Sequence, residues 1–291
     1  MEFRQYQLQA SETDQVPGKD IKALVVPLLG LAGETGSLLT LYKKYLRDGD
    51  AYHVIREKIS EELGDVLWYV ADTATKADLD LNEVVRQNLS KTRNRWLGGD
   101  KDEVLFDNGF PEGEQLPTRF RAGLKEEPGA QSPRVIMFLD GVQIGNELTD
   151  NSYDPDGYRY HDVFHLAYAS ILGWSPVLRA NLHRKRKSRP AVDQVEDGGR
   201  AIAIEEGVSA LVFTYAKNHS FLEGIATLDW GILRTVHEMT AHLEVGQRSL
   251  KRWEQAILEG YRVWREVVRN SGGLIECDLQ LKSIHYDAET A

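Results

Sequence analysis

Two short acidic segments near the N-terminus carry the side chains best suited to chemistry. The GETGS segment at 33–37 contains Glu34, and the EELGD segment at 61–65 contains Glu62 and Asp65. Apolar residues recur at helical spacing through both segments, which predicts that Glu34 and Glu62 face the protein interior. A buried carboxylate without a partner is costly, so a divalent cation or a basic side chain should accompany it.

Asp65 follows Glu62 by three residues and therefore shares its helical face. Two facing helices that bring Glu34 to this pair would form an all-oxygen site suited to Mg²⁺ or Mn²⁺. A second interpretation is an internal ion-pair network, in which Lys58, one turn before Glu62, neutralises the carboxylates. Spacing alone does not choose between a metal site and this network.

Four N-terminal helices are expected to position these residues. The predicted helices span about residues 2–11, 20–47, 52–76 and 80–96. Asp20 and Asp80 are suited to cap the second and fourth helices, and the short connections favour a four-helix bundle. Gly30, Gly33 and Gly36 lie inside the second helix, where each costs ~1 kcal/mol relative to alanine. We therefore expect another backbone to approach closely there.

The composition changes after the fourth helix, which predicts a domain boundary. Proline and glycine become frequent over 98–133. Strands are expected at 119–125, 134–139 and 142–144, with Asp140-Gly141 as a hairpin turn. A further strand within 274–281 could join this small antiparallel sheet. Helices return at about residues 160–172, 198–218, 230–243 and 249–269.

The expected organisation is mainly α-helical and has three parts: a helical metal-binding domain (1–97), a linker with the small sheet (98–150) and a C-terminal helical domain (151–291). Residues 204–211 echo residues 60–67. One interpretation of this echo is that the C-terminal domain is a diverged second copy of the bundle. The alternative is an accessory domain of separate origin.

The composition also excludes several classes of protein. The 291 residues are 42% hydrophobic, enough for a sizeable core, and a net charge of −10 argues against a nucleic-acid polymer as general partner. Cys277 is the only cysteine, which excludes an internal disulfide and a cysteine-based zinc site. No apolar run approaches membrane-spanning length and the N-terminus lacks a signal-peptide pattern, so we expect a soluble cytoplasmic protein.

Three motifs in order resemble the MazG-like, all-α nucleoside triphosphate pyrophosphohydrolases. They are GLAGETGSL over 30–38, EELGDVLWY over 61–69 and NLSKTR over 88–93, and the resemblance extends over about residues 3–96. It implies that an E-x-x-E helix and an E-x-x-D helix hold a divalent metal against a triphosphate. The implied reaction cleaves between the α and β phosphates and yields a nucleoside monophosphate and pyrophosphate.

By this resemblance Glu34, Glu62 and Asp65 are metal ligands. The residues implied as substrate contacts are Lys43, Lys44, Trp68, Asn88, Lys91 and Arg93. The second glutamate of the first motif is Ser37 here, and a neutral hydroxyl binds a hard cation more weakly than a carboxylate. Glu61 or another residue must therefore complete the coordination shell of the metal, or one of the metal positions is lost.

The chemistry of the acidic residues agrees with this activity. Mg²⁺ inverts the field of an acidic cleft, bridges carboxylates to phosphates and lowers the pKa of bound water. Glu61, beside Glu62, could orient that water. The alternative function is a nucleotide-binding regulatory or scaffold protein with a weakened catalytic site. The resemblance also implies a homo-oligomer.

A second set of chemical residues lies in the C-terminal half. His161 and His165 stand at i and i+4, a spacing that can bind a transition metal, although packing or capping is the commoner role for such histidines. The other candidates for a second site are Asp162, Lys185, Lys187, Arg200, Glu205 and Glu206. The basic run 184–187 could grip phosphates or remain a solvated loop.

Overall fold

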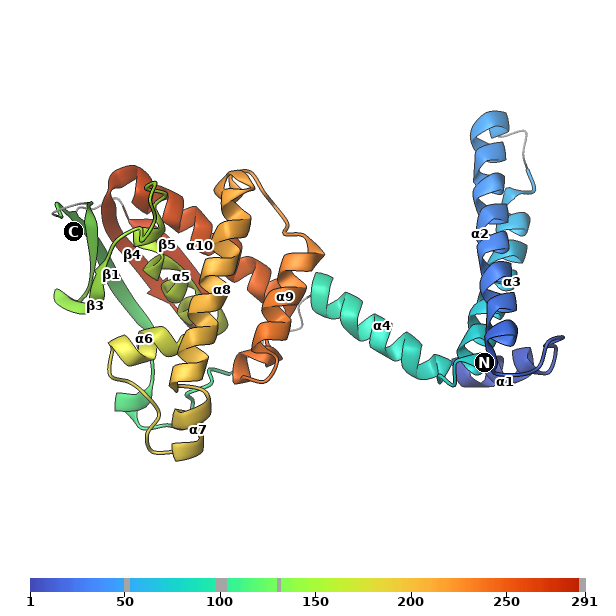
Figure 1. Ribbon diagram of the computed structural model, residues 1–291, viewed down its shortest axis with the longest axis horizontal. Coiled ribbons are helices and arrows are strands. Elements are labelled where there is room, and N and C mark those ends of the chain that lie inside the picture. Colours follow the sequence, from blue (N-terminus) through green and yellow to red (C-terminus); the bar gives the residue numbers. More distant parts are fainter. Residues whose placement is uncertain (50–52, 98–103, 130–131, 288–291) are drawn as a thin grey trace. The chain divides into compact units, whose positions relative to one another are not determined.

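The computed structural model describes residues 1–49, 53–97, 104–129 and 132–287, and its chain divides into two compact units, Met1–Thr92 and Arg93–Ala291 (Figure 1). The N-terminal unit is helical. The C-terminal unit combines helices with a small sheet. The expected fold class is confirmed: the protein is mainly α-helical with a small antiparallel sheet.

An antiparallel pair of long helices, α2 and α3, forms the body of the N-terminal unit (Figure 1). The helices span Phe3–Ser11 (α1), Ile21–Asp48 (α2), Ile55–Lys76 (α3) and Leu81–Trp96 (α4). Asp20 caps α2 as expected, because its carboxylate accepts a hydrogen bond of 2.7 Å from the Ala23 N–H. The Asp80 carboxylate accepts from the Asn82 N–H at 2.8 Å. Tyr52, the expected start of α3, lies outside the described residues.

The packed core of this unit is small. Ala10 of α1, Ala71 and Ala74 of α3 and Leu81 of α4 form it, with Tyr6, Trp68, Val70 and Val85 packed around them. Gly30 is needed because a Cβ there would lie 2.2 Å from the Tyr69 ring. The expected close approach of another backbone is therefore wrong, because the Tyr69 side chain makes the contact at Gly30. Gly33 and Gly36 face open space.

Helix α2 leaves much of its apolar surface exposed, including Leu29, Leu39 and Leu46, each 67% exposed. By length and composition α2 could cross a membrane, with a mean hydropathy of 1.6 over its most apolar stretch. The expectation that no apolar run approaches membrane-spanning length is thus wrong. The signal is weak evidence for a membrane, because helices of soluble proteins pass the same test.

One antiparallel sheet of five strands, ordered β3-β2-β1-β4-β5, lies in the C-terminal unit. The strands are Arg119–Glu127 (β1), Arg134–Leu139 (β2), Val142–Leu148 (β3), Gly272–Asp278 (β4) and Ser283–Asp287 (β5). Asp140 and Gly141 both have positive φ, 48° and 78°, so the expected hairpin turn is confirmed. The C-terminal strand also exists, and β5 adds a second hairpin that the sequence did not predict.

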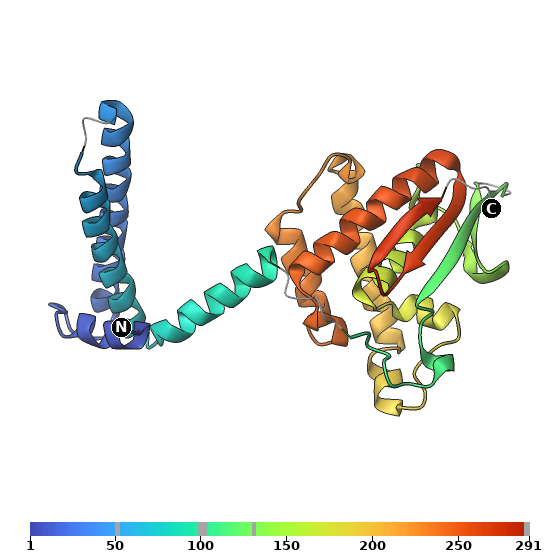
Figure 2. The ribbon, with the colours of Figure 1, turned by 180° about the vertical axis from the view of Figure 1, so that it is seen from behind.

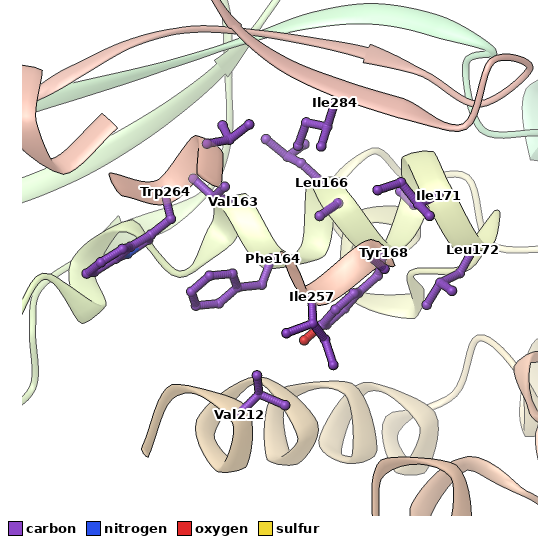
Figure 3. Close-up of a cluster of buried hydrophobic side chains, with 14 of the residues drawn as sticks. Val163, Phe164, Leu166, Tyr168, Ile171, Leu172, Val212, Ile257, Trp264 and Ile284 are labelled. Carbon is purple, nitrogen blue, oxygen red and sulfur yellow. The ribbon is translucent and has the colours of Figure 1, made fainter. Parts of the chain in front are cut away.

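Helices pack on this sheet around a central buried segment, α5 (Asp162–Ala167) continued by the π-helical Tyr168–Leu172. Figure 3 shows its side chains between Ile284 of β5, Val212 of α8 and Ile257 of α10. Figure 2 shows α10 lying alongside the two C-terminal strands. The remaining helices are α6 (Pro176–Asn181), α7 (Pro190–Val195), α8 (Gly199–Lys217), α9 (Trp230–Thr240) and α10 (Leu250–Asn270).

This sheet-centred core corrects the interpretation of a second bundle, because the C-terminal helices cover a sheet and do not repeat the α2–α3 pair. The last turn of α4 belongs to the same unit. The Asn94 side-chain oxygen accepts a hydrogen bond of 2.7 Å from the Leu250 N–H at the start of α10. The buried Arg95 donates to Glu254 at 3.1 Å and to the Leu228 carbonyl at 2.8 Å.

Candidate active site and a second cluster

Three carboxylates meet across the α2–α3 pair. Glu34 of α2 and Glu62 and Asp65 of α3 each offer an oxygen atom, and these atoms all lie within 4.8 Å of one another. The two helices run side by side, so one turn of each is enough to bring the acids together (Figure 1). The structure thus brings together the three residues that the sequence predicts as ligands. Their expected burial is wrong, because Glu34 and Glu62 are half-buried and Asp65 is exposed.

The three charges repel one another. Partial desolvation raises the pKa of Glu62, and the neighbouring charges of Glu34, Asp65 and Glu61 raise it further. The ion-pair interpretation fails in its expected form, because Lys58 pairs with Glu61 at 2.6 Å. Among the described residues, no ion pair with a lysine, arginine or histidine within 4.0 Å is found for Glu34, Glu62 or Asp65.

This arrangement fits a hard divalent cation. Two oxygen ligands of one Mg²⁺ lie at most ~4.2 Å apart, since each bond is ~2.1 Å long. The observed limit of 4.8 Å requires only a small side-chain adjustment. Ser37, one turn after Glu34 on α2, is half-buried and supplies no charge.

The other expected substrate contacts lie on exposed helix surface. Lys43 and Lys44 lie near the end of α2, and Asn88, Lys91 and Arg93 lie on α4, all of them exposed. Trp68 instead packs against the small core, and its indole N–H donates to the Thr13 hydroxyl at 2.8 Å. Its ring also meets Tyr69 edge to face. The structure therefore gives Trp68 a packing role.

A second group of potential ligands occurs in the C-terminal unit. His161, His165 and Glu206 offer three atoms that also lie within 4.8 Å of one another. Both histidines are buried, and the Glu206 side chain is 41% exposed. Asp162 is buried in the first turn of α5, where burial raises its pKa.

Comparison with known proteins identifies both parts of the chain. A family model described as the MazG nucleotide pyrophosphohydrolase domain matches residues 28–96, and one described as the MazG C-terminal domain matches residues 101–290. The chain belongs to the MazG family. The resemblance expected from the N-terminal motifs is therefore confirmed. The N-terminal match supports nucleotide pyrophosphohydrolase activity for this MazG-family protein.

A curated relative is the Gene 37 protein of Mycobacterium phage L5. It is 40% identical over 96 residues, which cover 31% of this chain and 84% of the phage protein. Its name states no activity. No solved structure matches the chain.

The basic run of the C-terminal MazG domain is largely structural. Arg186 is fully buried, and its guanidinium lies 2.7 Å from both Asp197 and Glu244. Arg184 donates hydrogen bonds to the carbonyls of Glu112 and Gln115. The other basic candidates are the half-buried Lys185 and the exposed Lys187 and Arg200. Among the described residues, no hydrogen bond or ion pair joins these three side chains to the histidine cluster.

Sequence reasoning grouped Glu205 with Glu206 but missed that they act differently. Glu205 is fully buried behind His165, whereas Glu206 faces the open side of the cluster. Ser175, which holds Glu205, was also missed. The only available signal was the Ser175-Pro176 pair, which is typical of a helix start and did not indicate a contact with α8.

Proposed function

We propose that this MazG-family protein is a divalent-metal-dependent nucleoside triphosphate pyrophosphohydrolase. It would convert an NTP or dNTP and water to the monophosphate and pyrophosphate. The observation that carries the proposal is the convergence of Glu34, Glu62 and Asp65 with no basic partner among the described residues. Three like charges held this close repel one another, and a bound cation would relieve that repulsion without requiring any of them to take up a proton.

Glu34, Glu62 and Asp65 would hold the ion from two sides, α2 and α3. When bound, Mg²⁺ or Mn²⁺ would supply Lewis-acid catalysis for attack of water on the triphosphate. Glu61 would accept the proton of the attacking water once its ion pair with Lys58 opens. The basic side chains of Lys43, Lys44 and Lys91, with the amide of Asn88, would contact the phosphates.

Ser37 supports a second candidate function. With three carboxylates in place of the four that two such motifs supply, the site could bind nucleotide and turn it over slowly or not at all. The protein would then act as a nucleotide-dependent regulator or scaffold, and the larger C-terminal unit would perform the regulatory or scaffold function.

We also propose that the chain forms a homo-oligomer in the cytoplasm. The exposed apolar side chains of α2, such as Leu29, Leu39 and Leu46, support the homo-oligomer. A second copy that covers this surface would remove it from water. Size measurement by light scattering tests the proposal, and a monomer at micromolar concentration would contradict it.

Pyrophosphate release from a panel of NTPs and dNTPs, with Mg²⁺ or Mn²⁺, tests the activity. We expect Glu62→Gln to reduce the rate by ~100-fold or more, because it removes a ligand charge that stabilises the reacting phosphates. Glu57→Gln, an exposed acid on the same helix, is the matched control and should retain the rate. Nucleotide binding without turnover in the unmodified protein would favour the regulatory function.

A further inference from the structure

The histidine cluster of the C-terminal unit has the geometry of a metal centre distinct from the carboxylate site. His161 and His165 come from the start of α5, and Glu206 comes from α8. The Nε2 atoms of His161 and His165 lie 3.7 Å and 3.6 Å from the Glu206 carboxylate. We propose that His161, His165 and Glu206 bind one divalent transition-metal ion of the Zn²⁺ class.

The hydrogen bonds of both rings direct a lone pair towards Glu206. His165 Nδ1 lies 2.8 Å from the Glu205 carboxylate, and His161 Nδ1 lies 2.9 Å from the Tyr158 carbonyl. A carbonyl and an ionised carboxylate only accept hydrogen bonds, so each Nδ1 must carry the proton. When neutral, a ring held in this way has its unprotonated nitrogen at Nε2, and this is the form of imidazole that binds metals.

The supporting contacts are those that a metal-binding histidine needs. Glu205 is itself held by the Ser175 hydroxyl at 2.6 Å and by the Val177 N–H at 2.8 Å. The Tyr158 ring stacks on His161, with ring centres 4.4 Å apart. A carboxylate behind a histidine fixes the ring and raises its basicity towards a metal. This carboxylate–histidine pair sits in the buried core, so the ligand orientation exists before any ion arrives.

The buried side of the cluster contains an unsatisfied atom. His165 is 1% exposed, and its Nε2 has no hydrogen-bond partner among the described residues. Its distance to Glu206 exceeds a hydrogen bond but approaches the ~3.3 Å that separates two ligands of a tetrahedral Zn²⁺ with ~2.0 Å bonds. Three protein ligands leave a fourth position, and the partly exposed Glu206 places that position on the solvent side.

The competing explanation of this cluster is that His165 carries a proton on Nε2 and forms a buried ion pair with the neighbouring glutamates. Although burial opposes its charged form, the Glu205 and Glu206 carboxylates raise the pKa of His165 to about 10. Burial and the charge of His165 lower the pKa of His161, which favours its neutral form. Without an ion, Nε2 of His165 would hold a proton near Glu206. A metal must displace that proton, so metal binding and a simple buried ion pair predict different results in a titration.

Zn²⁺ binding by the full chain in a Glu62→Gln background tests the proposal, because this background weakens the carboxylate site. After treatment with a chelator, we expect about one Zn²⁺ per chain to rebind, with release of protons. His165→Asn keeps a donor at the place of Nδ1 but removes Nε2, and Glu206→Gln removes the solvent-side ligand. Each change should weaken Zn²⁺ binding at least ~10-fold.

His242→Gln, on an exposed histidine outside the cluster, is the control and should bind Zn²⁺ like the background protein. Circular dichroism must show that the two cluster variants are folded, and Glu206→Gln changes a side chain that is partly exposed already. Co²⁺ gives an independent readout, since four-coordinate Co²⁺ absorbs strongly in the visible. The proposal is overturned if the background protein retains no ion, or if folded Glu206→Gln binds Zn²⁺ as tightly as the control.

Discussion

Two charged clusters, one in each unit, differ in how their charge is balanced. In the C-terminal unit, Arg186 is fully buried and is matched by Asp197 and Glu244, each 2.7 Å away. In the N-terminal unit, Glu34, Glu62 and Asp65 stand together without such a match among the described residues. Buried charge that is neutralised by the protein serves the fold. Charge that the protein leaves unbalanced is available for a ligand.

Removing the positive charge of Arg186 in the C-terminal unit should have the largest effect on stability. Arg186→Met leaves the buried Asp197 with only the more distant Arg179, at 3.8 Å, as an ion-pair partner among the described residues. We therefore expect the free energy of unfolding to fall by ~3–5 kcal/mol. Urea denaturation followed by tryptophan fluorescence measures this, with the exposed Arg200→Met as control. A loss equal to that of the control would show that the buried pairs do not stabilise this unit.

Two glycines of α2, Gly30 and Gly36, test how closely α2 and α3 pack in the N-terminal unit. Gly30→Ala forces a methyl group into the Tyr69 ring, so it should destabilise the unit by ~1–3 kcal/mol. Gly36→Ala meets open space and should stabilise the helix by up to ~1 kcal/mol. Thermal unfolding of both variants provides the measurement, and equal melting temperatures would argue against the close α2–α3 contact.

Adding a fourth carboxylate tests whether the N-terminal charge is reserved for an ion. Ser37→Glu places an acid one turn after Glu34, on the same helical face. We expect Mn²⁺ to bind about tenfold more tightly, because the new ligand adds charge to a hard-cation site. Calorimetric titration measures the affinity, with Ser37→Gln as the uncharged control. Equal affinities for the two variants would argue against a metal role for this face of α2.

The smallest expected effect concerns pH. Because the pKa of Glu62 is raised in the folded state, the folded protein binds more protons than the unfolded chain in that pH range. Without metal, stability should therefore decrease as pH rises from below the ordinary value of 4.5 through the raised pKa. Glu62→Gln should remove this decrease, and Mg²⁺ should counteract it. Thermal melts across pH 4–7 measure the trend, and an unchanged slope in Glu62→Gln would contradict it.

Local signals were predictable from the sequence because each acts over a few residues. Asp20 caps the helix that follows it, and Asp140-Gly141 adopts the two positive φ angles of a tight hairpin turn. The acidic candidates were predictable for a related reason, since helical periodicity places Glu62 and Asp65 on one face of their helix, and the resemblance to the MazG-like motifs added Glu34 from the preceding helix. Their exposure was not, because it depends on how little of α2 another segment covers.

Long-range partners left no local signal. Arg186 and Glu244 are 58 residues apart, so the basic run looked like a solvated or phosphate-binding loop. Helices α6 and α7 are six residues each, too short to show a period. The Glu205-Glu206 pair resembles the Glu61-Glu62 pair only in sequence. The fold shows that the Glu205 carboxylate of α8 lies 2.8 Å from Nδ1 of His165 in α5.

The end of α4 has a practical consequence for dividing the protein. The C-terminal family match begins at residue 101, but Asn94 and Arg95 already belong to the structure of that region. A fragment cut at residue 101 would expose the first amide of α10 and leave Glu254 with Lys251 as its remaining ion-pair partner among the described residues. Expression of the isolated C-terminal part should therefore start upstream of residue 93.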